Sequence, residues 1–236
     1  MKIAAVCCTY LRPKPLGHMI HCFEHQDYED RELVILDDAG QYDDARGDRW
    51  RLISLSSRFR SLGEKRNAAA SLVSPDVEAL AVWDDDDLYL PWALRASVAA
   101  LRVASWSRPS LVLHPQPDGS LRQHRTGGLF HGGWAYRRHT FEQCGGYPAK
   151  NNGEDRALAA RLAATGKPIA DPMRLGFRPF YVYLWGGGRH LSGMGPDGYE
   201  RLADAAVEKS AVTVCEPPAP DLRNPRILPG IRARVF

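Results

Sequence analysis

The chain has 236 residues, of which 44% are hydrophobic, and a formal net charge of +3. This composition supplies enough apolar side chains for a buried core, and the length predicts one domain or two closely packed halves. No apolar run approaches the ~20 residues that cross a bilayer, and the first residues lack the length and cleavage site of a signal peptide, so we expect a cytoplasmic protein without a membrane span. The five cysteines have no CxxC spacing, which argues against a disulfide framework or a thiolate zinc site.

Apolar runs alternate with segments of helical periodicity in the first part of the chain. The expected strands cover residues 2–7, 32–38, 50–55 and 79–83. The expected helices lie around residues 16–23, at 61–73 and at 91–103, and the second begins with the Ser61–Glu64 spacing of a capping box. Strands that alternate with helices predict an α/β fold with a mostly parallel central sheet flanked by helices.

The rest of the chain is less regular. We expect strands at 110–114, 129–137 and 177–185, and helices at 152–165 and 196–216. Residues 217–236 contain five prolines, four arginines and one acid, so they are predicted to form an extended basic tail. This tail could wrap its own domain, mediate a homodimer or contact an acidic acceptor.

Four consecutive carboxylates, Asp84 to Asp87, follow the expected strand at 79–83. Two unit charges ~4 Å apart repel by roughly 1 kcal/mol in water and about 4 kcal/mol at an effective dielectric near 20, so such a run in a crevice requires a cation. Carboxylate oxygens favour Mg²⁺, Mn²⁺ or Ca²⁺. Asp37 and Asp38 end an earlier strand, and ligands of open α/β sheets bind at the carboxyl ends of strands, so both acidic groups are expected to face one crevice. A solvated acidic loop is the alternative interpretation.

Two helix starts carry further charged residues. Lys65 and Arg66 lie in the first turn of the second helix, where the helix dipole favours anions, so a bound phosphate would explain them. Extension of both side chains into water is the alternative. Glu154 and Asp155 open the later helix, where they suit either the helix dipole or a general base that faces the crevice.

Three residues of the second half are weaker candidates. His190 follows three glycines, so it is either solvent-exposed or a late ligand of a metal site. Trp134 and Trp185 could stack on a sugar, with core packing as the other interpretation of each.

Five motifs occur in an order that resembles a family 2 glycosyltransferase of the GT-A fold, and they span Lys2 to about His190. The opening strand with its Thr-Tyr loop and the strand ending in Asp-Asp come first, and SLGEKRNAA then resembles the family's Gly-x-x-Arg-Asn helix start. VWDDDDLYLP resembles its DxD segment, GGWAYRRHTFEQCGGY its acceptor-side strand and turn, and GEDRALAARL its Glu-Asp base motif. The resemblance implies one catalytic domain at 1–216, with a nucleotide-sugar-binding half at 1–90 and an acceptor-side half at 91–195.

The resemblance also implies roles for individual residues. Positions that match nucleotide-sugar binding are Thr9, Arg12, Asp38, Lys65, Arg66, Asn67, Asp84 and Asp85. Asp86 matches the metal-binding aspartate, and His190 resembles a late histidine of the metal or diphosphate site. Asp155 matches the general base that deprotonates the acceptor hydroxyl. The candidate acceptor contacts are Trp134, Glu154 and Trp185.

The implied reaction transfers one sugar from a nucleotide diphosphosugar, with a UDP-sugar as the default, to an acceptor hydroxyl with inversion at the anomeric carbon. A divalent metal, Mn²⁺ or Mg²⁺, together with Lys65 or Arg66 would neutralise the departing diphosphate. Leu11 and Ala39–Gly40 depart from the residues common in the family, so base recognition is expected to differ. No Gln-x-x-Arg-Trp follows Asp155, which argues against a processive synthase. The acceptor, whether glycan, small molecule, protein or polynucleotide, is not determined.

Two other functions fit parts of the sequence. A sugar-phosphate nucleotidyltransferase also sets acids on an α/β sheet, but it needs a Gly-rich basic loop directly after the first strand, where this chain has CTYLRPKPLG. A nucleic-acid-binding protein would instead use the basic tail, and its affinity would depend strongly on salt.

Overall fold

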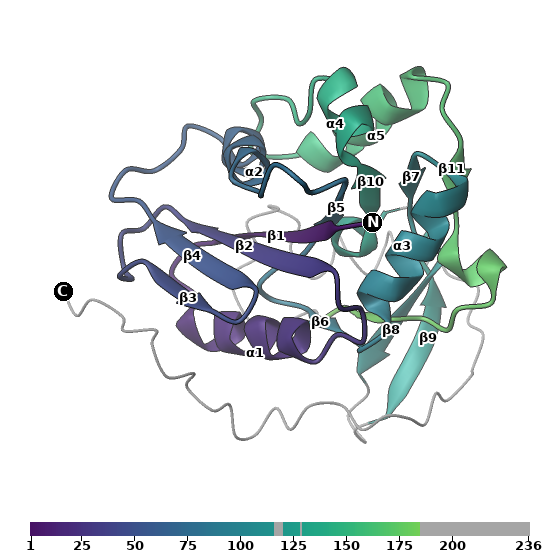
Figure 1. The fold of residues 1–236 in the computed structure, drawn as a ribbon, viewed down its shortest axis with the longest axis horizontal. Coiled ribbons are helices and arrows are strands. Elements are labelled where there is room, and N and C mark those ends of the chain that lie inside the picture. The colour runs from purple at the N-terminus through teal and green to yellow at the C-terminus, as the bar shows by residue number, and fades with distance from the viewer. Residues whose placement is uncertain (116–119, 128, 185–236) are drawn as a thin grey trace.

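A mixed central sheet organises the computed structural model, which describes residues 1–115, 120–127 and 129–184 (Figure 1). Its strands are β1 (Ile3–Thr9), β2 (Arg31–Asp37), β3 (Ala45–Gly47), β4 (Trp50–Ser54), β5 (Ala79–Val82), β7 (Trp106–Ser107), β10 (Ala135–Arg137) and β11 (Ile169–Ala170). They pair in the order β11-β7-β10-β5-β1-β2-β4-β3. The pairs β1–β2, β1–β5, β2–β4 and β7–β11 are parallel, whereas β10 and β3 run antiparallel to their neighbours. The predicted α/β fold with a mostly parallel sheet is confirmed.

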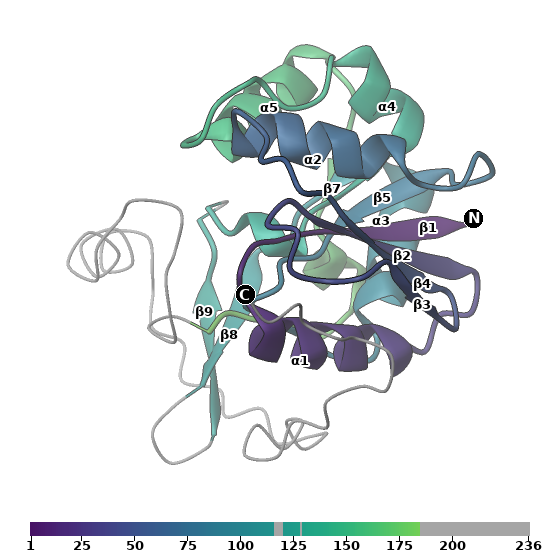
Figure 2. The same ribbon diagram turned by 90° about the vertical axis from the view of Figure 1, so that its left-hand side faces the viewer.

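Helices cover both faces of this sheet. They are α1 (Pro13–Glu24), α2 (Leu62–Ser71), α3 (Ala93–Val103), α4 (Arg138–Gln143) and α5 (Glu154–Ala164). Figure 2 shows α1 on one side of the sheet and α2 on the other, with α4 and α5 stacked beyond α2. The four apolar residues that predicted the first helix, from Leu16 to Phe23, are all buried. The Ser61 side chain accepts a hydrogen bond from the Glu64 N–H, as the capping-box spacing predicts.

Two apolar clusters fill the space between the sheet and these helices. Alternate side chains of a strand point to opposite faces. On β1, Ile3, Ala5 and Cys7 therefore join the cluster that includes α1 and α3, and Ala4 joins the cluster under α2, α4 and α5. The strands of the sheet centre are buried on both faces, which explains why their sequences read as continuous apolar runs.

A smaller sheet begins with the strand that directly follows the acidic run. Its strands are β6 (Leu88–Tyr89), β8 (Leu111–Pro115), β9 (Leu121–Arg125) and β12 (Tyr181–Val182), and they pair in the order β6-β12-β8-β9. Because β12 pairs with β6, a segment late in the chain returns to the end of β5. Two 3₁₀ turns, η1 (His131–Gly133) and η2 (Pro172–Leu175), complete the described elements.

Several predicted elements in the second half are shorter than expected. The strand predicted at 129–137 is only β10, because residues 131–133 form the η1 turn. The strand predicted at 177–185 is only β12; Pro179, which lacks an N–H to donate to a ladder, precedes it. Helix α5 begins at Glu154 rather than 152, with Gly153 at its N-cap in the left-handed region (φ 70°). The predicted helix at 196–216 and the tail at 217–236 lie outside the described residues.

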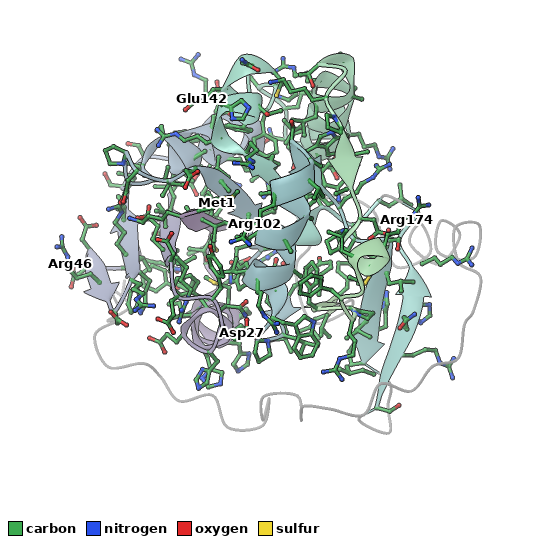
Figure 3. All side chains as sticks on the ribbon, turned by 45° about the vertical axis from the view of Figure 1, so that its right-hand side comes forward. Met1, Asp27, Arg46, Arg102, Glu142 and Arg174 are labelled. Carbon is green, nitrogen blue, oxygen red and sulfur yellow. The ribbon has the colours of Figure 1, made fainter. Side chains whose placement is uncertain are left out.

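Several charged side chains lie on the outer surface. Arg46 on β3, Glu142 on α4 and Arg174 on η2 are exposed and lie at the periphery in Figure 3. Within the described part of the chain, every helix is too short or too polar to cross a membrane. Among the described residues, four of the buried acids, Asp37, Asp38, Asp85 and Asp87, lie instead at the edge of the sheet.

Candidate active site

The carboxyl ends of β1, β2 and β5 bring the predicted acids together. β1 pairs in parallel with β2 on one side and β5 on the other, so that Thr9 lies opposite Asp37 and Val6 lies opposite Val82. Asp38 and the run that starts at Asp84 both follow directly from these ends. The expectation that the acids of the two strands share one edge is confirmed.

Asp85 and Asp86 are bridged by one guanidinium group. Arg12 Nη1 donates to Asp85 Oδ1 at 3.0 Å and to Asp86 Oδ2 at 2.7 Å, and the Thr9 hydroxyl donates to Asp85 Oδ2 at 2.7 Å. Burial, followed by the charge of Asp86, raises the pKa of Asp85 from 3.8 to about 6, against the opposing effect of Arg12. The carboxylate of Asp85 is 4% exposed and that of Asp86 is 28% exposed. Asp86 is thus the more accessible of the two.

Asp84 and Asp87 point to different partners. Asp84 Oδ1 accepts a hydrogen bond from Arg66 Nη2 at 3.1 Å. Asp87 is buried, where its Oδ2 accepts from the Tyr181 hydroxyl at 2.5 Å and its Oδ1 accepts from the Leu184 N–H at 2.9 Å. Burial raises the pKa of Asp87 well above its usual range. Asp87 therefore fastens β12 to the segment that follows β5.

The Lys65 side chain is buried and forms its hydrogen bonds within the protein. Its Nζ lies 2.5 Å from Asp38 Oδ1 and 2.5 Å from the Thr9 carbonyl oxygen, and both Lys65 and Asp38 are buried. The other Asp38 oxygen accepts from the Phe59 N–H at 3.1 Å. A buried carboxylate is tolerated where a cation and further donors satisfy it. Lys65 is thus the cationic partner of the buried Asp38 side chain, a role that its position in the helix sequence did not predict.

Arg66 and Asn67 connect α2 to the second half of the chain. Arg66 Nε lies 3.6 Å from Glu154 Oε1, so this arginine joins Asp84 at the end of β5 to the start of α5. Asn67 donates to the Tyr147 carbonyl oxygen at 2.8 Å and accepts from the Tyr147 N–H at 2.9 Å. The side-chain amide of Asn67 is therefore engaged in packing the Gly-Gly-Tyr turn against α2.

The two acids at the start of α5 have different surroundings. Glu154 is 6% exposed beside Arg66, and burial raises its pKa. Asp155 is half-buried, and its Oδ1 accepts from the Arg156 N–H at 2.7 Å. Trp134 is buried and packs edge-on against Trp106 at a ring separation of 6.1 Å, so core packing is its observed role rather than a surface contact to a sugar. His190 and Trp185 lie outside the described residues.

A cavity of about 400 Å³ opens beside these acids. Its volume lies within the range of small-molecule sites, about 300–1,000 Å³. The lining residues are Cys8, Thr9, Tyr10, Arg12, Asp38, residues 58–62, Lys65, Asp85 and Asn151. The charged members are four cations and two carboxylates, and both carboxylates already have a cationic partner. This surplus of positive charge suits an anionic ligand.

The loop at 55–61, between β4 and α2, was not predicted to belong to the site. It contributes Arg58, Phe59 and Arg60 to the cavity wall. Asn151 also escaped prediction; its Oδ1 accepts from the Leu62 N–H at 3.0 Å and so fixes the start of α2 against the segment before α5. Nothing in the composition of a short polar loop marks it as a cavity wall.

The donor chemistry at the acids fits a hard divalent cation. Within the described residues no cluster of three or more His, Cys, Asp or Glu side chains could hold a metal by itself. Mg²⁺-like ions, however, are commonly bound by one or two carboxylates together with substrate phosphates. Asp86 supplies such an accessible carboxylate beside the cationic cavity.

The fold is similar to that of solved GT-A glycosyltransferases. The first 349 residues of S. aureus TarS, solved in complex with UDP-GlcNAc, align over 87% of this chain and 66% of that one, with a TM-score of 0.60 and 16% identity. The mannosyltransferase PcManGT from Pyrobaculum calidifontis, in complex with GDP-Man and Mn²⁺, aligns over 80% of this chain and 58% of that one, with a TM-score of 0.58 and 16% identity. This chain thus spans less than two thirds of either. No protein-family profile and no curated protein sequence matches it.

Proposed function

We propose that this chain is a metal-dependent, inverting glycosyltransferase that moves one sugar from a nucleotide diphosphosugar to an acceptor hydroxyl. The observation that carries the proposal is the cationic cavity of about 400 Å³ that adjoins the acids at the ends of β1, β2 and β5. Two proteins of similar fold bind UDP-GlcNAc and GDP-Man with Mn²⁺, and these ligands have the same combination of base, diphosphate and sugar.

The base of the donor is assigned to Asp38. Each Asp38 oxygen accepts one hydrogen bond within the protein, from Lys65 or from Phe59, and an sp² oxygen can accept a second. The remaining lone pairs of Asp38 would accept a hydrogen bond from a donor group of the ligand. Uracil, thymine and guanine each present a ring N–H on the Watson–Crick edge, whereas the ring nitrogen of cytosine at that place is an acceptor. We therefore expect a UDP-, dTDP- or GDP-sugar as donor.

Asp86 is assigned to the metal and Arg12 to the diphosphate. A bound Mn²⁺ or Mg²⁺ would offset the negative charge that develops on the departing diphosphate. Arg12 pairs with Asp86 at 2.7 Å, so it must leave this carboxylate before a cation binds there. The donor diphosphate offers Arg12 an alternative bidentate partner of the same charge sign. Asp85, which stays buried, keeps Thr9 in place.

The general base is assigned to Asp155. The acceptor oxygen attacks the anomeric carbon, the bond from that carbon to the phosphate oxygen breaks, and the hydroxyl proton passes to a carboxylate. Attack opposite to the leaving group inverts the configuration. Asp155 is accessible at the start of α5, whereas Glu154 is buried and paired with Arg66, which suits a positioning residue.

Titration calorimetry with UDP-, GDP- and dTDP-sugars, with and without Mn²⁺, tests the donor assignment. Metal-dependent binding of at least one of them is expected, and its absence for all three would refute the proposal. Transfer by Asp155→Asn and Glu154→Gln variants then separates the two acids. Asp155→Asn is expected to abolish transfer and keep donor binding, and Glu154→Gln to retain measurable transfer; the reverse result would move the base to Glu154.

A further inference from the structure

Arg58 lies over the ring of Tyr10 on the wall of the cavity. Its Cζ is 4.3 Å from the ring centroid, well inside the ~6 Å limit of a cation–π contact. The side chain is exposed, and within the described residues it makes no ion pair with a carboxylate. Among the described residues, the guanidinium group of this exposed arginine contacts only the aromatic face of Tyr10.

The backbone that carries Arg58 is fixed on both sides. The Leu55 N–H donates to the Asp37 carbonyl oxygen at 2.9 Å, and the Phe59 N–H donates to Asp38 Oδ2 at 3.1 Å. Ser61 then caps α2. The Arg58 backbone is therefore anchored next to Asp38, while the only described contact of its guanidinium group is the one to Tyr10.

Two chemically different groups of side chains lie at the cavity. In one group Arg12 pairs with Asp85 and Asp86, and the proposed function assigns Arg12 to the diphosphate and Asp86 to the metal. In the other group Asp38, Tyr10 and Arg58 supply a carboxylate, an aromatic ring and a planar cation. The second set matches a flat heterocycle that has an N–H donor at its edge.

We propose that Arg58 covers the nucleobase of the donor. On ligand binding its guanidinium group leaves the Tyr10 ring and stacks on the face of the base that points away from Tyr10. This inference rests on the proposed function, because it takes the ligand to be a nucleoside diphosphate. At 4.3 Å the guanidinium leaves no space for a base between itself and the ring, so it must lift away. The π face of the base then takes the place of the Tyr10 ring beneath the guanidinium, which keeps the free energy of opening small.

The test compares ligands that carry a base with one that does not. Affinities for UDP, GDP, uridine, guanosine and inorganic pyrophosphate are measured by calorimetry on the full chain for wild type, Arg58→Ala and Arg58→Lys. Arg46→Ala is the control, because Arg46 is also an exposed arginine but lies on β3 and is not part of the cavity wall.

Arg58→Ala is expected to weaken the preferred nucleoside and its diphosphate by the same factor, about 3-fold to 30-fold, with Arg58→Lys in between. The pyrophosphate affinity of Arg58→Ala is expected to stay within about twofold of the wild-type value, and so are all affinities of Arg46→Ala. An equal loss for pyrophosphate and UDP would make Arg58 a phosphate ligand and overturn the inference. Unchanged nucleoside affinity would overturn it too, while leaving the proposed function intact. Base-dependent binding through Arg58 without any sugar transfer would support the inference and defeat the transferase proposal.

Discussion

Asp85→Asn should stabilise the free protein at neutral pH although it alters the candidate site. Asparagine has nearly the same shape as aspartate, and its Oδ1 can still accept the hydrogen bond from the Thr9 hydroxyl that Asp85 accepts at 2.7 Å. What disappears is the buried negative charge. Because burial disfavours that charge, its removal lowers the free energy of the folded state.

The magnitude follows from the pKa of Asp85, which burial raises from 3.8 to about 6. The difference of about two pH units corresponds to roughly 3 kcal/mol. Between about pH 4 and pH 6 the folded protein holds a proton that the unfolded chain has released, so the stability of the wild type falls as pH rises through this window. Asp85→Asn escapes this loss. Its advantage should reach up to about 3 kcal/mol at pH 8, less what Arg12 loses as a partner, and vanish below about pH 4.

Urea unfolding followed by far-UV circular dichroism from pH 4 to pH 8 measures this difference. Asp48→Asn is the control, because the Asp48 side chain is 91% exposed and its replacement should change stability by less than about 0.5 kcal/mol at any pH. An Asp85→Asn variant that is no more stable than wild type at pH 8, or an advantage that does not shrink toward pH 4, would refute the reasoning. We also expect the variant to bind the donor more weakly, since function at such sites opposes stability.

Other substitutions test the remaining contacts. Lys65→Met leaves a buried carboxylate without its cation and should lower the free energy of unfolding by about 3–5 kcal/mol in urea titrations, and a loss below about 1 kcal/mol would mean that the pair is dispensable. Arg12→Gln should raise the affinity for Mn²⁺ in the absence of nucleotide about tenfold, because a cation that competes for Asp86 is removed. Electron paramagnetic resonance measures this affinity, and equal values for the variant and the wild type would contradict the proposal that Arg12 leaves Asp86 when the metal binds. Gly63→Ala should strongly destabilise the fold, because its Cβ would overlap the Pro148 carbonyl oxygen, whereas Gly17→Ala, with no atom within 4 Å, should be neutral or stabilising by up to about 1 kcal/mol in thermal unfolding.

The strands and helices of the first half were predictable because their causes are local. A strand buried on both faces needs a continuous apolar run, and a helix needs apolar residues every three or four positions, so both can be read from neighbours in the chain. The second half was predicted less well. Its strands are two to five residues long, and the residues at 131–133 form a turn whose cause lies in tertiary contacts, since Gly132 packs against Tyr181.

The gathering of acids at one sheet edge follows from the sequence, because parallel strands align their carboxyl ends and the acids follow those ends directly. Which cation pairs with which acid depends instead on tertiary packing. Lys65 meets Asp38 across 27 residues, and Tyr181 meets Asp87 across 94. Such pairs depend on how α2 and β12 pack against the sheet. No local sequence pattern predicts a contact between residues so far apart in the chain. For the same reason a polar loop at 55–61 became a cavity wall, and the pairing of its Arg58 with Tyr10 emerged only in three dimensions.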